Sequence, residues 1–187
     1  PARYFSWRFR GNSLTLAYDE RLQGEYDLLI ATSMTDLSAL KGMCPRIANV
    51  PSVLYFHENQ FVYPVNTDSN SLKAVKNTGG LAQRTIEMQI TNIYSALAAD
   101  RLIFNSAYNK NTFLDGAEKL LRKMPDHVPA CIGQSLETKS QVVPVPLGEE
   151  CFQEAVRVGK FSILWNHRWE FDKGLDELRQ IVSGLLE

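Results

Sequence analysis

The sequence predicts an α/β protein built around a mainly parallel β-sheet, because strand-like and helix-like segments alternate along it. The strand-like segments are short runs rich in β-branched and aromatic residues, at 26–31, 53–56, 101–104, 141–145 and 161–165. The helix-like segments repeat apolar residues every three or four positions, at 81–99, about 109–123 and 175–186. Parallel strands need a long crossover connection, and a helix usually supplies it.

Local signals set the ends of several elements. A short helix is expected after the first strand, opened by the capping side chain of Thr35 or Asp36. The stretch at 63–80 is rich in Asn, Ser, Thr and Gly, which predicts a loop. Pro125 and Pro129 close the helix that precedes them, and a loop is expected from there to the next strand.

Composition narrows the class of protein. The chain has 187 residues and a net charge of −1, which argues against a strongly basic nucleic-acid-binding surface but leaves a local patch open. Its cysteines are scattered without CxxC spacing: Cys44, Cys131 and Cys151. We therefore expect a cytoplasmic protein without disulfides or a structural zinc site. No apolar stretch approaches the roughly 20 residues that span a bilayer. Because Pro1 is not an initiator methionine, the natural protein is expected to begin upstream.

Polar side chains follow two of the predicted strands at the point where open α/β sheets bind ligands. The segment His57-Glu58-Asn59-Gln60 follows one, and Asn105-Ser106 follows the next. By position alone, His57 is either a catalytic side chain or a hydrogen-bonded structural histidine. The pair Asn105-Ser106 either lines the same edge or, as the pattern favours for Ser106, caps the next helix.

A metal site is not expected here. The His-Glu-x-x-His pattern of metal-binding helices would need a second histidine, and Phe61 fills that position.

A third polar cluster, Asn166-His167-Arg168-Trp169-Glu170, follows the strand expected at 161–165, with Lys173-Gly174 just beyond it. A nucleotide diphosphate binds where cations and free backbone N–H groups meet at a helix start. Arg168 and Lys173 are therefore candidate diphosphate-binding residues. The alternative is a solvated turn in which both cations pair with Glu170 or Asp172.

The segment from Arg3 to Arg10 interleaves three arginines with four aromatic residues. One interpretation assigns it to phosphate contacts and base stacking on RNA. The other is an edge strand whose side chains Tyr4, Trp7 and Phe9 pack inward. Both remain open from the sequence.

Taken together, these segments resemble the tRNA-queuosine α-mannosyltransferases, which are similar to family 4-like glycosyltransferases of the two-domain GT-B type. The segments that carry the resemblance are Ser6–Arg10, Leu54–Gln60 with Tyr63-Pro64, Ile103–Ser106 with Asn109, Pro125–His127 with Pro129, and Ile163–Glu170 with Asp172-Lys173. The resemblance implies a Rossmann-like sheet in an incomplete GT-B fold. Residues 1–158 would be the acceptor-side domain without its first strand–helix unit, and 159–187 the first strand and helix of the donor-nucleotide domain.

The resemblance also implies a function and roles for the candidate residues. We expect a retaining glycosyltransferase that moves mannose from GDP-mannose to queuosine in tRNA without a metal. His57 would be catalytic, and Arg168 and Lys173 would bind the donor diphosphate. The remaining candidates would bind the acceptor: Glu58, Asn59, Asn105, Ser106, Trp7, Arg8 and Arg10.

Two alternatives belong to other functional classes. One is a non-catalytic module that binds RNA or a sugar nucleotide, and the other is a transferase of the same fold that acts on a lipid or a small glycoside. Fold alone does not choose among them.

Overall fold

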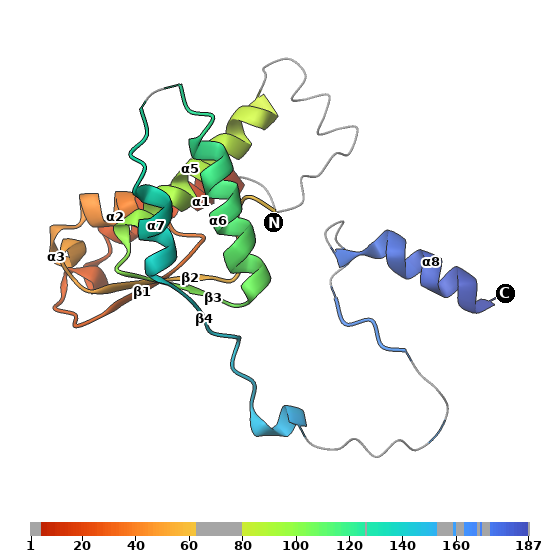
Figure 1. Cartoon of the computed structure of the whole chain (residues 1–187). Coiled ribbons are helices and arrows are strands. Elements are labelled where there is room, and N and C mark those ends of the chain that lie inside the picture. Colours follow the sequence, from red (N-terminus) through yellow and green to blue (C-terminus); the bar gives the residue numbers. More distant parts are fainter. Residues whose placement is uncertain are drawn as a thin grey trace. The chain divides into compact units, whose positions relative to one another are not determined.

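The computed structural model describes residues 5–62, 80–125, 127–152, 159, 163–167, 169 and 173–186. The chain divides into two compact units. The described residues up to Val145 belong to the first unit, and those from Pro146 onward belong to the second. Figure 1 shows the elements in chain order.

The first unit contains a four-stranded parallel sheet, as the alternating segments predict. The strands lie in the order β1 (Leu29–Thr32), β2 (Ser52–Phe56), β3 (Arg101–Phe104) and β4 (Ser140–Val142). Each strand pairs in parallel with the strand that follows it in the chain. Helices connect them: α2 (Leu37–Met43) and α3 (Pro45–Ala48), then α5 (Gly80–Ala98), then α6 (Ala107–Leu121) and α7 (Ile132–Thr138).

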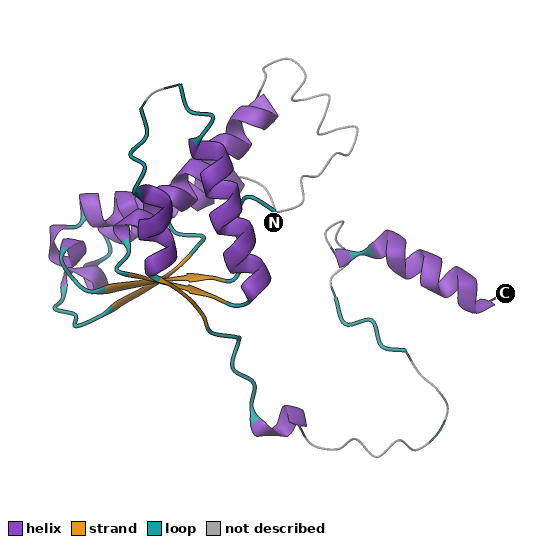
Figure 2. Ribbon diagram, in the orientation of Figure 1, coloured by secondary structure: helices purple, strands orange, loops and turns teal. Residues whose placement is uncertain are grey.

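The described helices of this unit gather on one face of the sheet (Figure 2). On that face Leu54, Phe56 and Phe104 are fully buried against α5 and α6. The rings of Phe56 and Phe104 stack with their centroids 4.6 Å apart. On the other face Ile30 keeps 67% of its surface exposed. Successive strand residues point to opposite faces of the sheet, so the buried ones lie on the face that the helices cover.

Of the two interpretations of residues 3–10, the edge strand is wrong where the structure describes this segment. Phe5–Ala17 form helix α1, and three of its buried residues, Phe9, Ser13 and Ala17, lie four residues apart. This spacing is helical. Ala17 packs with Leu40 of α2 in a small second core.

Two other expectations need correction. The last strand of the sheet begins at Ser140 and ends at Val142 instead of covering 141–145, and the helix α7 forms where only a loop was expected. In α7 Leu136 is buried and Ile132 packs partly against the same core, but a helix of 7 residues is too short to repeat this spacing and so to be identified from sequence.

The second unit contains the 3₁₀ turn η2 (Glu149–Phe152) and the helix α8 (Leu175–Leu186). The helix agrees with the expected 175–186. No strand forms within 163–167, although one was expected at 161–165; Phe161 and Ser162 lie outside the described residues. A strand needs a hydrogen-bonded neighbour, and the described part of this unit contains none.

Candidate functional site

The carboxyl ends of the strands bring the predicted polar residues into one row. Phe56 lies opposite Phe104 in the sheet register, so His57 and Asn105 follow at neighbouring positions. Ser33 N donates to Tyr55 O at 2.9 Å, which places Ser33 beside them on the β1 side. His57 and Asn105 thus lie on the same edge of the sheet, which was one of the two alternatives for Asn105.

The backbone carbonyls on both sides of His57 are held by asparagine side chains. Asn109 Nδ2 donates to Phe56 O at 2.9 Å, and Asn105 Nδ2 donates to His57 O at 2.8 Å. Asn109 Nδ2 also donates to Asn105 Oδ1 at 2.9 Å, so the two amides support each other. The backbone at His57 is therefore fixed by groups from β3's end and from α6.

The rest of this turn is held from the opposite side. Ser33 Oγ donates to Glu58 O at 2.8 Å, and Asn92 Oδ1 accepts from Gln60 N at 3.1 Å. Asn92 Nδ2 donates to Ser33 O at 3.0 Å, which joins these two supports. Buried amides are costly unless their groups are hydrogen-bonded, and fully buried Asn92 has partners for both its oxygen and its nitrogen.

Asn59 lies inside the protein, with only 1% of its surface exposed. Its Nδ2 donates to Asn109 Oδ1 at 2.8 Å and to Thr112 Oγ1 at 3.1 Å, and its Oδ1 accepts from Phe61 N at 2.9 Å. These bonds use its amide within the fold. Its effect on a ligand would therefore act through the position of the turn.

His57 itself is exposed, and Glu58 is half-buried. The turn thus has a fixed backbone and an accessible imidazole at the edge of the sheet. A side chain that acts on a bound substrate requires such a preorganised geometry.

Ser106 caps α6, as the pattern favoured. Its Oγ accepts from Asn109 N at 3.1 Å and donates to Asn105 Oδ1 at 3.3 Å. Asp36 likewise caps α2 by accepting from Ala39 N at 3.0 Å. The Ser106 cap fixes the first turn of the helix that carries Asn109.

In the second unit, Lys173 is half-buried and lies two residues before Leu175, the first residue of α8. Gly174 O accepts from Leu178 N at 2.9 Å, which begins the helix, and Gly174 has a φ of +69° that favours glycine. The first turn of α8 carries Asp176 and Glu177. The partial positive charge at the start of a helix stabilises these carboxylates, and it would stabilise a bound phosphate in the same way. Arg168 lies outside the described residues.

The basic-aromatic segment is only partly described. The side chains of Trp7 and Arg8 lie outside the described residues. Arg10 is exposed and pairs with Glu87 of α5, with Nη1 and Oε2 3.8 Å apart. An exposed pair of this kind costs little to open, so it leaves the guanidinium accessible to another anion.

No group of three His, Cys, Asp or Glu side chains that could hold a metal occurs among the described residues. Within that same part of the chain, no helix is both long enough and apolar enough to cross a membrane.

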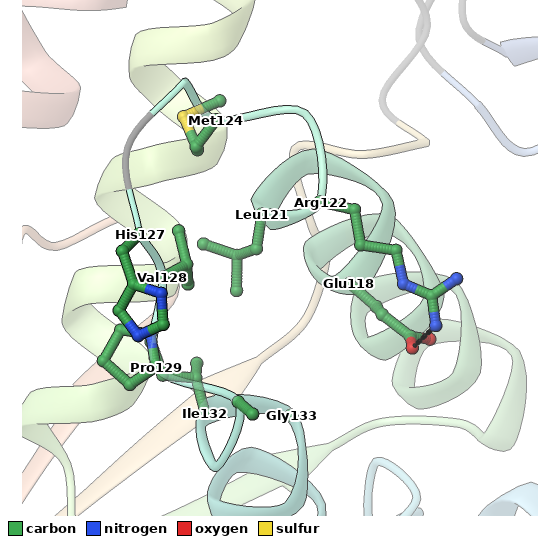
Figure 3. A pocket seen from close by; sticks show the side chains of 10 residues that line it. Glu118, Leu121, Arg122, Met124, His127, Val128, Pro129, Ile132 and Gly133 are labelled. Atoms are coloured by element: carbon green, nitrogen blue, oxygen red, sulfur yellow. Dashed lines mark hydrogen bonds and ion pairs between the residues drawn. The ribbon is translucent and has the colours of Figure 1, made fainter.

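A pocket of about 480 Å³ opens at the far end of α6 (Figure 3). Leu121, Met124 and Ile132 form its apolar wall, and the Glu118–Arg122 ion pair lies on its rim. The 15 residues of α6 separate this end from the Ser106 cap by about 22 Å. None of the predicted site residues lines the pocket. It is therefore distinct from the edge that carries His57.

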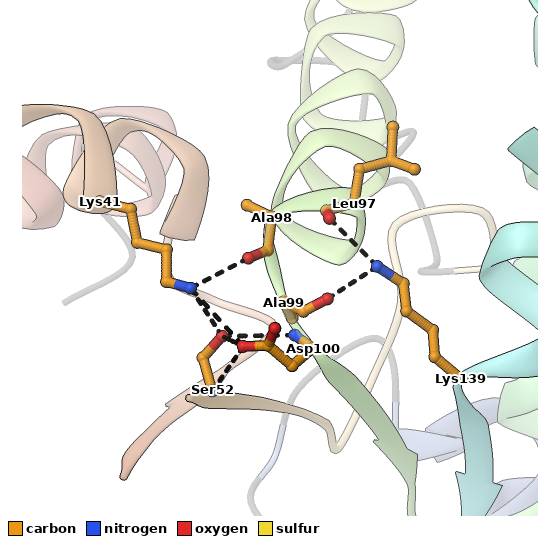
Figure 4. Close-up of polar contacts among 7 residues, drawn as sticks. All are labelled: Lys41, Ser52, Leu97, Ala98, Ala99, Asp100 and Lys139. Atoms are coloured by element: carbon orange, nitrogen blue, oxygen red, sulfur yellow. Dashed lines mark hydrogen bonds and ion pairs between the residues drawn. The ribbon is translucent and has the colours of Figure 1, made fainter. Parts of the chain in front are cut away.

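A second polar cluster lies at the opposite, amino ends of the strands (Figure 4). Lys139 Nζ donates to Leu97 O at 3.1 Å and to Ala99 O at 2.7 Å, and Lys41 Nζ donates to Ala98 O at 3.2 Å. Both cations thus satisfy carbonyl oxygens at the carboxyl end of α5, where positive charge is favourable.

Asp100 completes this cluster. Its Oδ2 accepts from Ser52 N at 2.7 Å and from Ser52 Oγ at 2.8 Å. These hydrogen bonds hold the pKa of the Asp100 carboxyl below its ordinary value, and the nearby cations Lys41 and Lys139 add to the effect. Burial lowers the pKa of Lys139, which Asp100 partly offsets. These contacts join the carboxyl end of α5 to the start of β2 and to the residue before β4, which indicates a structural role.

Sequence reasoning missed the supports of the turn. Asn92 could have been noticed, because it is an amide on a helix whose neighbour Ile93 points into the core. Asn109 belongs to one of the segments that carry the family resemblance, and Ser33 lies just after the strand expected at 26–31. No pattern in the sequence connects either residue with residues 56–60.

Comparison with known proteins gives two findings and one negative result. Residues 1–147 match the family model described as tRNA-queuosine alpha-mannosyltransferase N-terminal. A tRNA-queuosine alpha-mannosyltransferase of Drosophila melanogaster is 34% identical over 184 residues, which cover 92% of this chain and 45% of the relative. The chain thus spans about half the length of that relative. No solved structure matches the chain.

Proposed function

This chain belongs to the tRNA-queuosine α-mannosyltransferase family, and from that membership we propose that the whole protein mannosylates queuosine in tRNA. GDP-mannose would be the donor. The bond between the anomeric carbon and the diphosphate oxygen breaks, and a bond to a queuosine hydroxyl oxygen forms with retention of configuration. The hydroxyl proton leaves with the departing GDP. A tRNA acceptor would place this reaction in the cytoplasm.

Under this proposal, residues 1–158 form the acceptor-side domain and residues 159–187 begin the donor-nucleotide domain. The presence of a separate compact unit from Pro146 onward supports a division in this part of the chain. Arg168 and Lys173 would bind the donor diphosphate. The position of Lys173 two residues before the start of α8 supports its part, because helix starts favour anions.

The observation that carries the catalytic assignment is the exposed His57 on a fixed turn. Its imidazole would contact the sugar during transfer and stabilise charge that develops there, in a reaction that needs no metal. Glu58, Asn105 and Ser106 would shape the acceptor side of the same edge. Asn59 would contribute by holding the turn, because it is buried.

Trp7, Arg8 and Arg10 would contact the tRNA. The local basic character of this helix supports the assignment, since phosphate contacts depend on accessible cations and the whole chain has a net charge of only −1.

The test uses the full-length protein, radiolabelled GDP-mannose and two tRNA preparations that differ only in queuosine. Label transferred to the queuosine-containing tRNA alone supports the proposal. Binding of this tRNA without transfer would indicate a non-catalytic module. Transfer to a lipid extract but to neither tRNA would indicate a different transferase of the same fold.

A further inference from the structure

Asn109 connects the end of β2 with the start of α6. Its Nδ2 donates to Phe56 O at 2.9 Å and to Asn105 Oδ1 at 2.9 Å, while its Oδ1 accepts from Asn59 Nδ2 at 2.8 Å. Only 5% of its surface is exposed. The amide nitrogen and the amide oxygen are therefore both hydrogen-bonded, and these bonds fix the plane of the amide.

The bond to Phe56 O is additional to the sheet. Phe56 O already accepts from Asn105 N at 3.1 Å, which continues the ladder between β2 and β3. A carbonyl oxygen has two lone pairs, and Asn109 supplies the second donor. The carbonyl before His57 is thus held from two directions.

This arrangement has a geometric consequence for His57. Phe56 O lies in the peptide plane before His57, and His57 O lies in the plane after it. Asn109 holds the first oxygen and Asn105 holds the second, at 2.9 and 2.8 Å. The φ and ψ angles of His57 relate these two planes, so fixing both planes fixes the direction of its Cα–Cβ bond.

We infer that Asn109 is a positioning residue of the transfer reaction, which acts by setting the direction of the His57 side chain. The inference rests on the proposed function. A misplacement of about 1 Å in a reacting group can lower a rate roughly a hundredfold. Asn109 lies on the first unit, so its loss leaves the donor diphosphate contacts proposed for Lys173 in place.

The test is the substitution Asn109→Asp in the full-length enzyme. Aspartate keeps the size of the side chain and an oxygen that accepts from Asn59 Nδ2, but it places a second oxygen against Phe56 O. We expect kcat to fall about a hundredfold, with KM for GDP-mannose and Kd for GDP within about twofold of the wild-type values. Asn111→Asp is the matched control, because Asn111 is exposed on the same helix; its kcat should stay within twofold.

A second background separates positioning from structure. In a His57→Ala protein the residue to be positioned is absent, so adding Asn109→Asp should lower kcat no further. A merely structural asparagine would lower kcat by a similar factor in both backgrounds, and that result would overturn the inference.

Asn109→Ser, which is smaller and uncharged, serves if the aspartate variant does not fold. Failure of both variants to fold would assign Asn109 to the framework alone and would also overturn the inference. Transfer by the wild type together with normal kcat in the variants defeats the inference but leaves the proposed function intact. A wild type without transfer defeats both.

Discussion

Phe61 lies directly over Gly116 of α6, so close that a Cβ at position 116 would overlap the Phe61 ring and come within 2.7 Å of its Cβ. The ring also meets Phe113 edge-on, with centroids 5.8 Å apart. Glycine at 116 therefore allows the end of the His57–Gln60 turn to close onto the helix.

Gly116→Ala should displace Phe61 and loosen the turn. Overpacking of this kind costs about 1–3 kcal/mol of unfolding free energy, and we expect kcat of the full-length enzyme to fall with it. The control is Gly42→Ala on α2, where an added Cβ meets nothing within 4 Å. Because alanine favours helices over glycine by roughly 1 kcal/mol, the control should be as stable as the wild type or more so. Equal melting temperatures for the two variants would show that an added Cβ at position 116 does not overpack against Phe61.

Substitution of His57 separates catalysis from binding. His57→Ala should lower kcat by about 10²–10³-fold, the usual effect of removing one group that stabilises developing charge. The affinity for GDP should barely change, since the proposed diphosphate contacts lie elsewhere. His57→Gln should recover part of the activity if hydrogen bonding is its role. Single-turnover transfer to queuosine-containing tRNA measures this, and near-normal transfer by a stable alanine variant would remove His57 from the site.

Lys173→Ala should weaken GDP binding. A charge-assisted hydrogen bond contributes about 1.5–3 kcal/mol, which corresponds to a loss of roughly ten- to a hundredfold in affinity. Calorimetric titration of the full-length protein with GDP measures the effect. Lys123→Ala, an exposed cation of the first unit, is the control. Unchanged GDP affinity in the Lys173 variant would show that the start of α8 does not bind the diphosphate.

The Asp100 carboxyl predicts a specific dependence of stability on pH. Its folded-state pKa is lowered below the ordinary 3.8, chiefly by Ser52. Its charge-dependent stabilisation is therefore full above the unfolded pKa and is lost as pH falls through the folded pKa.

The free energy of unfolding should thus differ between wild type and Asp100→Asn by a constant amount near neutrality. The difference should shrink below about pH 4. Ser52→Ala removes one of the two donors and should reduce this acid-dependent part. Urea unfolding at a series of pH values measures both. A difference that is independent of pH would contradict the role given to the ionised carboxylate.

The isolated 187-residue chain should show no mannosyl transfer, because it spans 45% of the length of its fly relative and the proposed reaction needs both domains. It should also unfold at low temperature, since Ile30 on the sheet remains 67% exposed and parallel sheets are normally covered on both faces. Transfer assays and thermal unfolding of the purified chain test this. Robust turnover would overturn the two-domain proposal.

The alternation of strands and helices was enough to predict the parallel sheet, because each buried strand carries a short apolar run such as Val53–Phe56. It did not predict α1, since the aromatic residues before Phe9 suggested a strand, and the buried spacing Phe9, Ser13, Ala17 includes a serine. Ser13 is accommodated because its Oγ donates to Asp36 O at 2.7 Å. Local propensity did not determine whether this segment is a strand or a helix, and the tertiary contact of Ser13 favours the helix.

The residues of the candidate site also differ in whether the sequence alone could identify them. His57 could be found from its place after a strand, which is a local property. The supports at Ser33, Asn92 and Asn109 could not be assigned, because each depends on which residues the sheet brings together. Asn59 illustrates the difference: the sequence shows an amide beside His57, but only the fold shows that it points inward.

The hydrogen bonds that hold residues 56–60 join positions 25, 32, 48 and 53 residues apart in the chain. Contacts of this range form only after the cost of closing long loops has been met, so the turn around His57 should be ordered late in folding. The amide of Gln60, which donates to Asn92 of α5, should therefore be strongly protected from hydrogen exchange. We therefore expect the edge that carries His57 to form only when β1, β2, β3 and the helices α5 and α6 are all in place.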